Sequence, residues 1–568
     1  MDWLKAKYIV PPLFLVFCFL LFKSISYPLL WNDESETVMT AKHILKFGYP
    51  KMTDEKNCIF LPGDPTWIAY KKSSDANISI PWGSYYFAAI GVYFAELTDD
   101  IYLKGGIIRT TFAFTGLLGL VIFVFGFRRF FIEKNHFYWF FAAFFFFEIF
   151  SVTLLLHMRE ARYYSLVILT VACFFYVLLR YLFSEKISDK KYFILMTIVL
   201  FGVYQINVLA FSACIVTMVM YELYSLLSAA LSSPDLAQNK SVWFKFQIKK
   251  AFLHLSPLLL CCFLIVPFVI YFETFSILER ATKFYDYRPG SFMNHLDRLI
   301  FVFSSQDFLY AALFLKSLRI IVWLRNLFFS DSGDKTFNEN EKKISDASVL
   351  FTLFFISFAI LVCRMPIFWT RHFIVLQPIL TLVIFMDSWL IWKTVSAHAK
   401  AMERLLLQIG FGLVLISGLA IPIKRKLFIS NEYLFQIYYQ YQGPLDFIIP
   451  FLKQHYKHPE KLVIATNYEE LCYIYYLDCK VTMGYMLKNL EEDMKLQPDV
   501  IIFRKEWKHN RSYFKTLVDH GKYTPVVFPV YDNRVNNIAE IDADLGHFFR
   551  TQLAIETADQ THILLLEK

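Results

Sequence analysis

The stretch "GIIRTTFAFTGLLGLVIFVFGF", residues 106–127, decides the fold class. It is apolar over enough residues to cross the hydrocarbon core of a bilayer as a helix, which takes about 20. Arg109 stands near its start, and Arg128 and Arg129 follow directly after its end. An apolar run with a basic flank is typical of a membrane-spanning helix.

The rest of the chain repeats this pattern. Of its 568 residues 57% are hydrophobic and 62 are Phe, more than a water-soluble core of this size needs. Eleven stretches satisfy the length rule, near residues 8–30, 106–127, 137–156, 163–183, 192–208, 209–230, 251–272, 301–325, 348–363, 371–392 and 405–423. We therefore predict a mainly α-helical, multi-pass membrane protein with about eleven transmembrane helices.

Charge in the loops sets the expected orientation. The first stretch follows "MDWLKAK" and is too long and too aromatic for a cleavable signal peptide, so we read it as a retained anchor. With the N-terminus inside, the inner loops are all basic, as the positive-inside rule expects. These loops account for the net charge of +8, and nothing argues for a nucleic-acid partner.

The outer side then receives the loop 31–105 and everything after residue 423. Beyond about residue 440, β-rich runs such as "KLVIATN" alternate with helical runs at 468–477, 487–496 and 511–521. This alternation predicts an α/β domain with a largely parallel sheet over residues 431–568, behind a transmembrane module at 1–430. Its aromatic helix "CYIYYL" rests either on the membrane face or on the transmembrane module. No GxGxxG motif accompanies it, so no nucleotide site is expected.

Two short outer turns carry arginines that run against the charge rule. These residues are Arg159 and Arg162 in "HMREARYYSL", and Arg364 and Arg371 in "CRMPIFWTRHF". In one interpretation they reach lipid phosphates or pair with Glu160. In the other they hold an anionic group at the outer boundary, because guanidinium matches phosphate oxygens bidentately.

The long outer loop begins with "WNDESETVMTAKHILKFGYP", residues 31–50, which places acidic residues directly behind the first span. Its apolar residues at helical spacing predict a short interfacial helix ended by Gly48 and Pro50. A second helix is expected at 81–97. The loop would lie along the membrane as a lid, with Asp33 and Glu34 at the boundary between water and lipid.

Three segments taken in order resemble one family. They are "WNDESETVMTAKHILKFGYP" (31–50), "PWGSYYFAAIGVYFAELTDDIYLKGGIIRTTFAFTGLLGLVIFVFGFRRFF" (81–131) and "REARYYSLVILTVACFFYVLLRYL" (159–182). Together they are similar to the opening third of polytopic glycosyltransferases with the type C fold, near the protein O-mannosyltransferases and the lipid A aminoarabinose transferases. "RHFIVLQPIL" (371–380) is similar to a later segment of that family, with His372 in place of the usual Tyr.

This resemblance implies a sugar donor on a polyprenyl phosphate and an acceptor that is a glycolipid, a polysaccharide or a protein. Transfer would invert the anomeric centre on the outer, periplasmic side of a bacterial inner membrane. No cofactor and no metal site are indicated.

Such a transfer needs a base opposite the leaving group. A carboxylate with an ordinary pKa of about 4 is ionised at pH 7 and can accept the hydroxyl proton, and we assign this role to Asp33. Glu34 would orient Asp33 or the acceptor. The alternative is that Asp33, Glu34 and Glu36 only cap the helix that follows, where negative charge is favoured; for Glu36 we adopt that reading.

The leaving phosphate needs preorganised donors where its charge develops. Arg162 and Arg371 each open a span at the outer boundary and are the candidates, with Arg159 and Tyr163 assisting. For Arg109 we prefer a structural role, in which it pairs with a carboxylate and fixes the loop to the second span. Candidate lining residues are Tyr285, Arg288 and His372.

Two other functions remain open. A flippase for the lipid-linked sugar, or another lipid transporter without chemistry, would place polar residues mid-span and repeat its halves. A membrane scaffold would only present the C-terminal domain. Six of the nine Cys fall in apolar spans, while Cys472 and Cys479 lie in a polar region, where they would pair only in an oxidising compartment.

Overall fold

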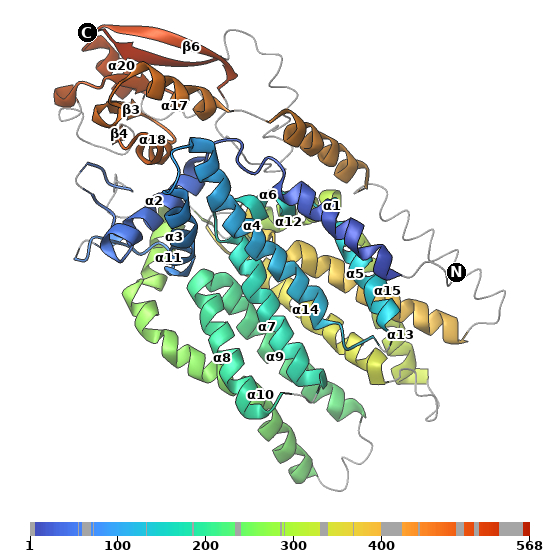
Figure 1. Cartoon of the computed structure of the whole chain (residues 1–568). Helices are drawn as coiled ribbons and strands as arrows, with labels where there is room; N and C mark the ends of the chain where they lie inside the picture. Colours follow the sequence, from blue (N-terminus) through green and yellow to red (C-terminus); the bar gives the residue numbers. More distant parts are fainter. Residues whose placement is uncertain are drawn as a thin grey trace.

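The computed structural model is mainly helical, with a small sheet near the C-terminus (Figure 1). It describes residues 6–54, 56–59, 70–71, 73–131, 133–184, 187–232, 240–284, 287–288, 290–329, 339–366, 369–398, 423–440, 443–483, 494–504, 511–532 and 560–567. The long helices form a bundle, and the unit containing the sheet lies at one end of it. We call this end of the bundle the sheet end.

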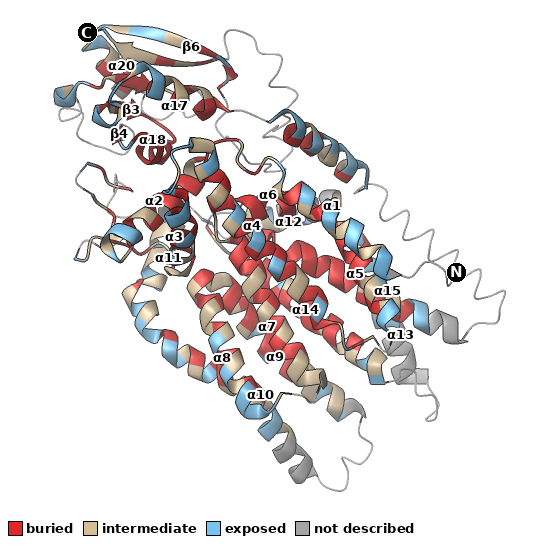
Figure 2. Cartoon of the chain, viewed as in Figure 1, coloured by how far each residue is buried: buried red, intermediate tan, exposed pale blue. Residues whose placement is uncertain are grey.

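Six helices in the described part are long and apolar enough to cross a membrane. They are α4 (Ile101–Gly126), α7 (Tyr164–Ser184), α9 (Val208–Ser232), α10 (Lys240–Tyr271), α14 (Glu339–Cys363) and α15 (Leu376–His398). Their inward faces are buried and much of their outer surface is exposed (Figure 2). This distribution of apolar surface indicates an integral membrane protein.

Two predicted spans, 137–156 and 301–325, are each broken into two helices. In the first, α5 (Lys134–Ile149) meets α6 (Val152–Arg159) at 82°, and in the second, α12 (Ser291–Gln306) meets α13 (Leu309–Phe329) at 93°. If each pair is one span, the described part holds eight. The predicted number of eleven is not confirmed: α1 (Val10–Phe22) is shorter, α8 (Asp189–Ile206) is not among these eight, and 405–423 lies almost entirely outside the described residues.

The centre of the bundle is the close contact between α4 and α7. Gly119 on α4 makes it possible, since a Cβ there would lie 2.8 Å from the backbone Cα of Leu169 on α7. At Gly116 a Cβ would lie 2.9 Å from the side chain of Met158 on α6. Small residues at such positions let helix backbones approach closely. The contact fixes the end of α6 and the start of α7, where Arg159 and Arg162 lie.

A further helix over residues 423–439 packs beside α1 on the flank of the bundle, drawn in brown in Figure 1. Polar contacts join its buried side to both broken helix pairs. The Lys426 ammonium lies 3.0 Å from Asp307 Oδ1 and donates to Ser151 Oγ at 3.2 Å, and Gln377 Nε2 donates to Asp307 Oδ2 at 2.9 Å. These partners neutralise charges that would be costly to bury alone.

Both helices predicted for the loop 31–105 are present in its described part. Its helices are α2 (Asn32–Phe47), which ends at Gly48 with φ +82°, and α3 (Gly83–Ala95). A positive φ favours glycine, so Gly48 ends the helix at the expected residue. The remaining short elements are η1 (Ala6–Tyr8), β1 (Tyr70–Lys71), β2 (Ala76–Asn77), α11 (Thr274–Phe284) and η3 (Thr370–Phe373).

The C-terminal unit contains a five-stranded sheet of order β4-β3-β5-β7-β6. Its elements are α17 (Pro444–His455), η4 (Pro459–Lys461), β3 (Val463–Thr466), α18 (Glu470–Leu477), β4 (Lys480–Met483), β5 (Val500–Ile502), α20 (Arg511–Asp519), β6 (Tyr523–Tyr531) and β7 (Gln560–Leu566). β3 pairs with β4 and β5 in parallel, whereas β7 pairs antiparallel with β5 and β6. The sheet is thus mixed, not largely parallel as expected, because the last strand inserts between β5 and β6. The predicted helical run 487–496 lies mostly outside the described residues.

The C-terminal unit docks on the segment 27–31, which we call the strap. Asp446 Oδ1 accepts a hydrogen bond from Leu29 N at 2.9 Å, and the Tyr476 hydroxyl accepts one from Leu30 N at 3.1 Å. The Cys472 thiol lies 3.3 Å from the Leu30 carbonyl oxygen. The aromatic helix α18 therefore rests on the bundle, the second of the two expected positions, and Cys472 and Cys479 are both free thiols.

Candidate active site

The helix α2 begins directly after the strap and carries three carboxylates near its start, Asp33, Glu34 and Glu36. They point in two different directions. Successive residues on a helix point about 100° apart, whereas residues three apart share a face. Asp33 and Glu36 therefore face one way and Glu34 another. Glu34 also caps the helix, since its Oε2 accepts a hydrogen bond from Trp31 N at 3.3 Å.

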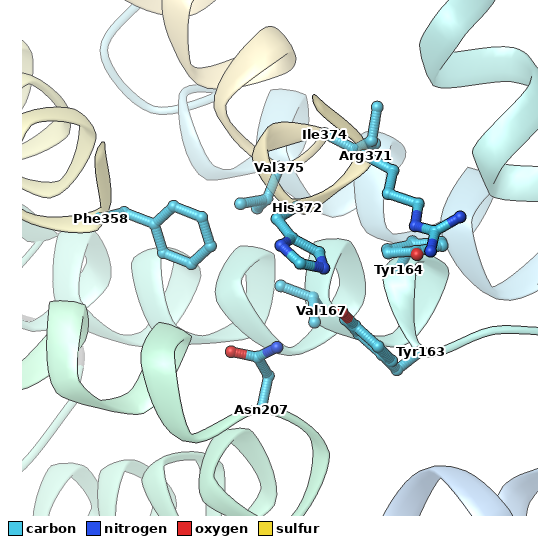
Figure 3. Close-up of a pocket in the computed structure, with 9 residues that line it drawn as sticks. All are labelled: Tyr163, Tyr164, Val167, Asn207, Phe358, Arg371, His372, Ile374 and Val375. Atoms are coloured by element: carbon cyan, nitrogen blue, oxygen red, sulfur yellow. The ribbon is translucent and has the colours of Figure 1, made fainter. Parts of the chain in front are cut away.

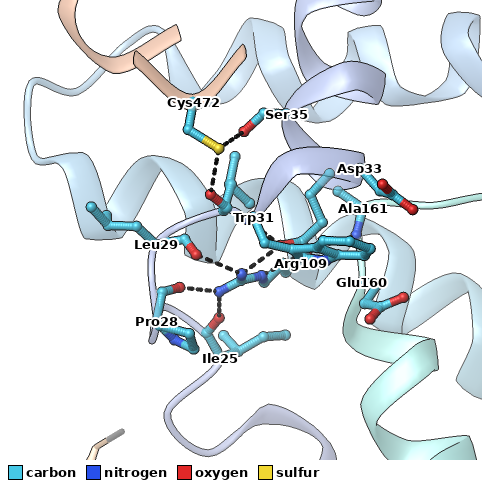
Figure 4. A network of polar contacts seen from close by, with 12 residues as sticks. Ile25, Pro28, Leu29, Trp31, Asp33, Ser35, Arg109, Glu160, Ala161 and Cys472 are labelled. Carbon is cyan, nitrogen blue, oxygen red and sulfur yellow. Dashed lines mark hydrogen bonds and ion pairs between the residues drawn. The ribbon is translucent and has the colours of Figure 1, made fainter. Parts of the chain in front are cut away.

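Glu34 is fully buried in an ion pair with Arg109 on α4. Figure 4 shows the Arg109 guanidinium beside Ile25, Pro28 and Leu29. Arg109 donates to the two carboxylate oxygens from Nε at 2.8 Å and from Nη2 at 2.6 Å. It also donates to three strap-side carbonyls, those of Ile25, Pro28 and Leu29. Arg109 thus pairs with a carboxylate, as predicted. Because Glu34 is 0% exposed, it belongs to the scaffold and has no surface that an acceptor could reach.

Asp33 projects from a different side of α2 than Glu34 and keeps 20% of its side chain exposed. Its Oδ2 lies 2.9 Å from Arg371 Nη2 and 3.9 Å from Arg162 Nη2. The Arg371 guanidinium lies over the rings of Trp31 and Trp369, at 5.3 and 5.1 Å. Stacking on aromatic faces fixes a guanidinium plane while leaving its N–H groups directed at acceptors.

Arg162 is the second cation of this cluster. From Nη1 it donates to the Asp33 backbone oxygen at 2.9 Å and to Glu36 Oε2 at 3.0 Å. The Tyr85 hydroxyl on α3 donates to the other oxygen of Glu36 at 3.2 Å. Two guanidinium groups from separate turns therefore meet two partly exposed carboxylates, Asp33 at 20% and Glu36 at 14%.

A small cavity lies beside Arg371 (Figure 3). It is lined by Tyr163, Tyr164, Val167, Asn207, Phe358, Arg371, His372, Ile374 and Val375. Its volume is about 10 Å³, which is roughly the space that one water molecule needs. In this structure the guanidinium groups of Arg371 and Arg162 are paired with Asp33 and Glu36. A substrate anion would have to displace these carboxylates in order to bind.

His372 forms one wall of that cavity and belongs to η3, which precedes α15. Burial, together with the charges of Arg371, Arg162 and His157, lowers the pKa of His372 to about 3. The imidazole is therefore neutral at physiological pH, and the cations of the site are guanidinium groups alone.

This lowered pKa makes stability depend on pH. The unfolded chain binds a proton at His372 below its ordinary pKa of 6.5, whereas the native protein does not until the pH approaches about 3. The stabilisation that comes from keeping His372 neutral is therefore fully present above pH 6.5 and is lost as the pH falls towards 3. We expect the melting temperature in detergent to drop less between pH 7 and pH 5 for His372→Gln than for the wild type. His520→Gln, at an exposed position, is the control, and equal drops in all three proteins would contradict the assignment.

Three of the remaining predicted residues, Arg159, Tyr163 and Arg288, lie in the described part of the structure. Arg159 is buried and donates to the Tyr433 hydroxyl at 2.8 Å, which directs it towards the helix 423–439. Tyr163 lines the cavity next to Arg371. Arg288 is exposed near the start of α12, where its backbone N–H donates to Ser291 Oγ, and Tyr285 lies outside the described residues.

Sequence reasoning missed two members of the cluster, Glu36 and Tyr85. The signal for Glu36 was present, because it follows Asp33 by three residues on a predicted helix and so shares its face. Tyr85 gave no comparable signal, since its contact with Glu36 depends on how α3 packs against α2.

Within the residues described, no group of three or more His, Cys, Asp or Glu side chains is arranged to hold a metal ion. In comparisons with known proteins, no protein family model matches the chain and no curated protein matches it.

Proposed function

We propose that the protein is a membrane glycosyltransferase that moves a sugar from a polyprenyl phosphate to an acceptor, with Asp33 as the base. One observation carries the proposal. Asp33 is a partly exposed carboxylate held between the guanidinium groups of Arg371 and Arg162, which come from two different turns of the bundle. A base beside two phosphate-binding groups is the minimum that this chemistry requires.

The reaction balances with these groups alone. The bond between the anomeric carbon and the phosphate oxygen breaks, and the acceptor hydroxyl oxygen forms the new bond from the opposite face. Asp33 takes the hydroxyl proton as that bond forms, and the phosphate leaves with the bonding electron pair. Arg371 and Arg162 stabilise the developing negative charge, because preorganised donors need no reorganisation during the reaction.

Several features of the fold support the resemblance to type C glycosyltransferases. The acidic start of α2 follows the first apolar helix, and α3 precedes the long helix α4 that carries Arg109. Arg162 stands immediately before α7, and Arg371 lies in η3 before α15. The elements that carry the similar segments thus meet around Asp33, although they are far apart in the chain.

We further propose that the sheet end of the bundle faces the periplasm of a bacterial inner membrane. Among the basic loops predicted for the inner side, the turn after α4, which contains Arg128 and Arg129, is described and lies at the end of the bundle opposite the sheet (Figure 1). Asp33 and the C-terminal unit would then lie on the outer side, where an acceptor arrives.

The test uses the full chain purified in detergent, a polyprenyl phosphate carrying a labelled sugar, and an extract of membrane glycolipids, polysaccharide and protein as acceptor. We expect free polyprenyl phosphate to appear in proportion to labelled acceptor. Translocation of the labelled lipid across proteoliposomes without any release would instead support the transporter hypothesis and refute ours.

Arg371→Gln should lower kcat/KM in that assay by about 10²–10³, the cost of removing one donor to a developing oxyanion. Arg364→Gln is the matched control, because Arg364 is an exposed arginine in the same turn. We expect it to retain nearly full activity. Equal losses in both variants would show that general charge in this turn, not a specific phosphate contact, supports turnover.

A further inference from the structure

A groove separate from the candidate active site runs between α1 and the helix 423–439. It is lined by Phe19, Lys23, Asn431, Leu434, Phe435, Ile437, Tyr438 and Tyr439, and its volume is about 380 Å³. It shares no lining residue with the cavity beside Arg371. Its size falls in the range of small-molecule sites, about 300–1,000 Å³.

Two hydrogen bonds hold the walls of the groove together. The Tyr433 hydroxyl donates to the Leu20 carbonyl oxygen at 2.5 Å, and Ser24 Oγ donates to the Ile437 carbonyl oxygen at 2.9 Å. The partners advance by four residues on each side, from Leu20 on α1 to Ser24 just past its end and from Tyr433 to Ile437, so the two segments run parallel here. The groove therefore has one wall from each segment.

The helix 423–439 buries several polar side chains and exposes large apolar ones. Lys426, Glu432 and Gln436 are buried together with Tyr433 and Ile437, whereas the exposed side carries Leu427, Phe428, Leu434 and Tyr438 beside Lys424 and Asn431. Buried charges below exposed large apolar side chains are unusual for a surface helix of a water-soluble protein and fit a face that contacts lipid chains.

An apolar stripe on α1 ends in a cation at the residue after the helix. Leu15, Phe19 and Lys23 follow one another at intervals of four residues and so lie in one row about 12 Å long, of which Phe19 and Lys23 line the groove. Leu15 and Phe19 are 66% and 54% exposed. Lys23 is exposed at the end nearer the sheet unit, and the described residues that line the groove include this one ammonium and no carboxylate. An apolar row that ends in a cation matches a lipid chain that ends in an anion.

We propose that this groove binds one anionic phospholipid of the surrounding bilayer, with its phosphate at Lys23 and its acyl chains along the two apolar walls. A phosphodiester carries one negative charge and a phospholipid has two chains, which matches one ammonium and two rows of apolar side chains. A polyprenyl phosphate, with a phosphate monoester and a single chain, matches the pair of arginines at Asp33 better.

A lipid bound in the groove would affect how the helices of the bundle pack. Tyr433, which bonds Leu20 on one wall, also accepts the hydrogen bond from Arg159. A lipid that holds α1 against the helix 423–439 would therefore stabilise the contact on which Arg159 rests. This inference depends on the protein lying in a membrane, not on the proposed transferase activity.

The test measures lipid binding to the full-length protein in detergent by native mass spectrometry. The probes are phosphatidylglycerol, phosphatidylcholine and polyprenyl phosphate at matched concentrations. We expect one molecule of phosphatidylglycerol to bind in preference to phosphatidylcholine. Lys23→Gln should weaken this binding about fivefold, the effect of one basic residue near an anionic lipid surface.

Two further variants make the outcome decisive. Lys46→Gln, at an exposed lysine outside the groove, should bind phosphatidylglycerol as the wild type does, and Lys23→Arg should retain the preference. Equal binding of both phospholipids, or an unchanged affinity in Lys23→Gln, would overturn the proposal. Displacement of phosphatidylglycerol from wild-type protein by an equal concentration of polyprenyl phosphate, lost in Lys23→Gln, would assign the groove to the carrier lipid instead. None of these three results would bear on transferase activity.

Discussion

Asp33→Asn should reduce sugar transfer by about 10²–10⁴, the usual contribution of a positioned general base. The substitution keeps the size of the side chain and removes its ability to accept the acceptor proton. Arg371 and Arg162 remain, so binding of the donor phosphate should persist or strengthen, because Asp33 no longer competes for Arg371 at 2.9 Å. The expected pattern is thus a large fall in kcat with KM for the donor unchanged or lower.

The control for this prediction is Asp99→Asn. Asp99 is exposed in the same long loop, just before α4, and the same chemical change there should leave turnover near that of the wild type. Full activity of a folded Asp33→Asn protein would refute the assignment of the base. Loss of donor binding together with turnover would show that Asp33 acts by positioning Arg371 instead.

Arg109→Leu should have the largest effect on folding, about 3–5 kcal/mol of unfolding free energy. The change leaves the Glu34 carboxylate without its cation in a site that is 0% exposed. It also removes the donors to the carbonyls of Ile25, Pro28 and Leu29. We expect a strongly lowered melting temperature in detergent and a loss of monodisperse protein.

The double variant Glu34→Leu with Arg109→Leu separates the effect of the unpaired Glu34 charge from the effect of the lost hydrogen bonds to the strap. It removes the unpaired charge, so stability should recover in part, but the strap carbonyls still lack a donor. Lys104→Leu on the same helix breaks an exposed pair with Glu96 and should cost under about 1 kcal/mol. If Arg109→Leu melts like Lys104→Leu, the buried pair contributes little to the fold.

The membrane class, the helices of the first outer loop and the pairing of Arg109 with a carboxylate could be predicted because each depends on local composition or on one compensating charge. The breaks in α5–α6 and α12–α13 could not. A hydropathy window averages over about 20 residues and records how apolar a segment is, without its direction. The break at residues 150–151 contains no Pro, so no local sequence signal marks the turn of 82°.

The site could be predicted only in part, because the sequence does not show the direction in which each side chain points. Adjacent carboxylates read as a pair in the sequence, but the helix that begins at Asn32 turns Asp33 and Glu34 to different sides. Asp33 meets the arginines and Glu34 enters the core, while Glu36 returns to the face of Asp33. That Arg162 and Arg371 reach the same carboxylate depends on the packing of α7, η3 and α2, which no single segment specifies.

The strap also constrains how the protein is made. The N–H groups of Leu29 and Leu30 find their acceptors in residues that follow 417 and 446 positions later in the chain. At about 5–20 residues per second, a ribosome needs tens of seconds to supply them. Throughout that interval the strap beside Asp33 lacks these two partners, so it can reach its native hydrogen bonding only after residue 476 has been made.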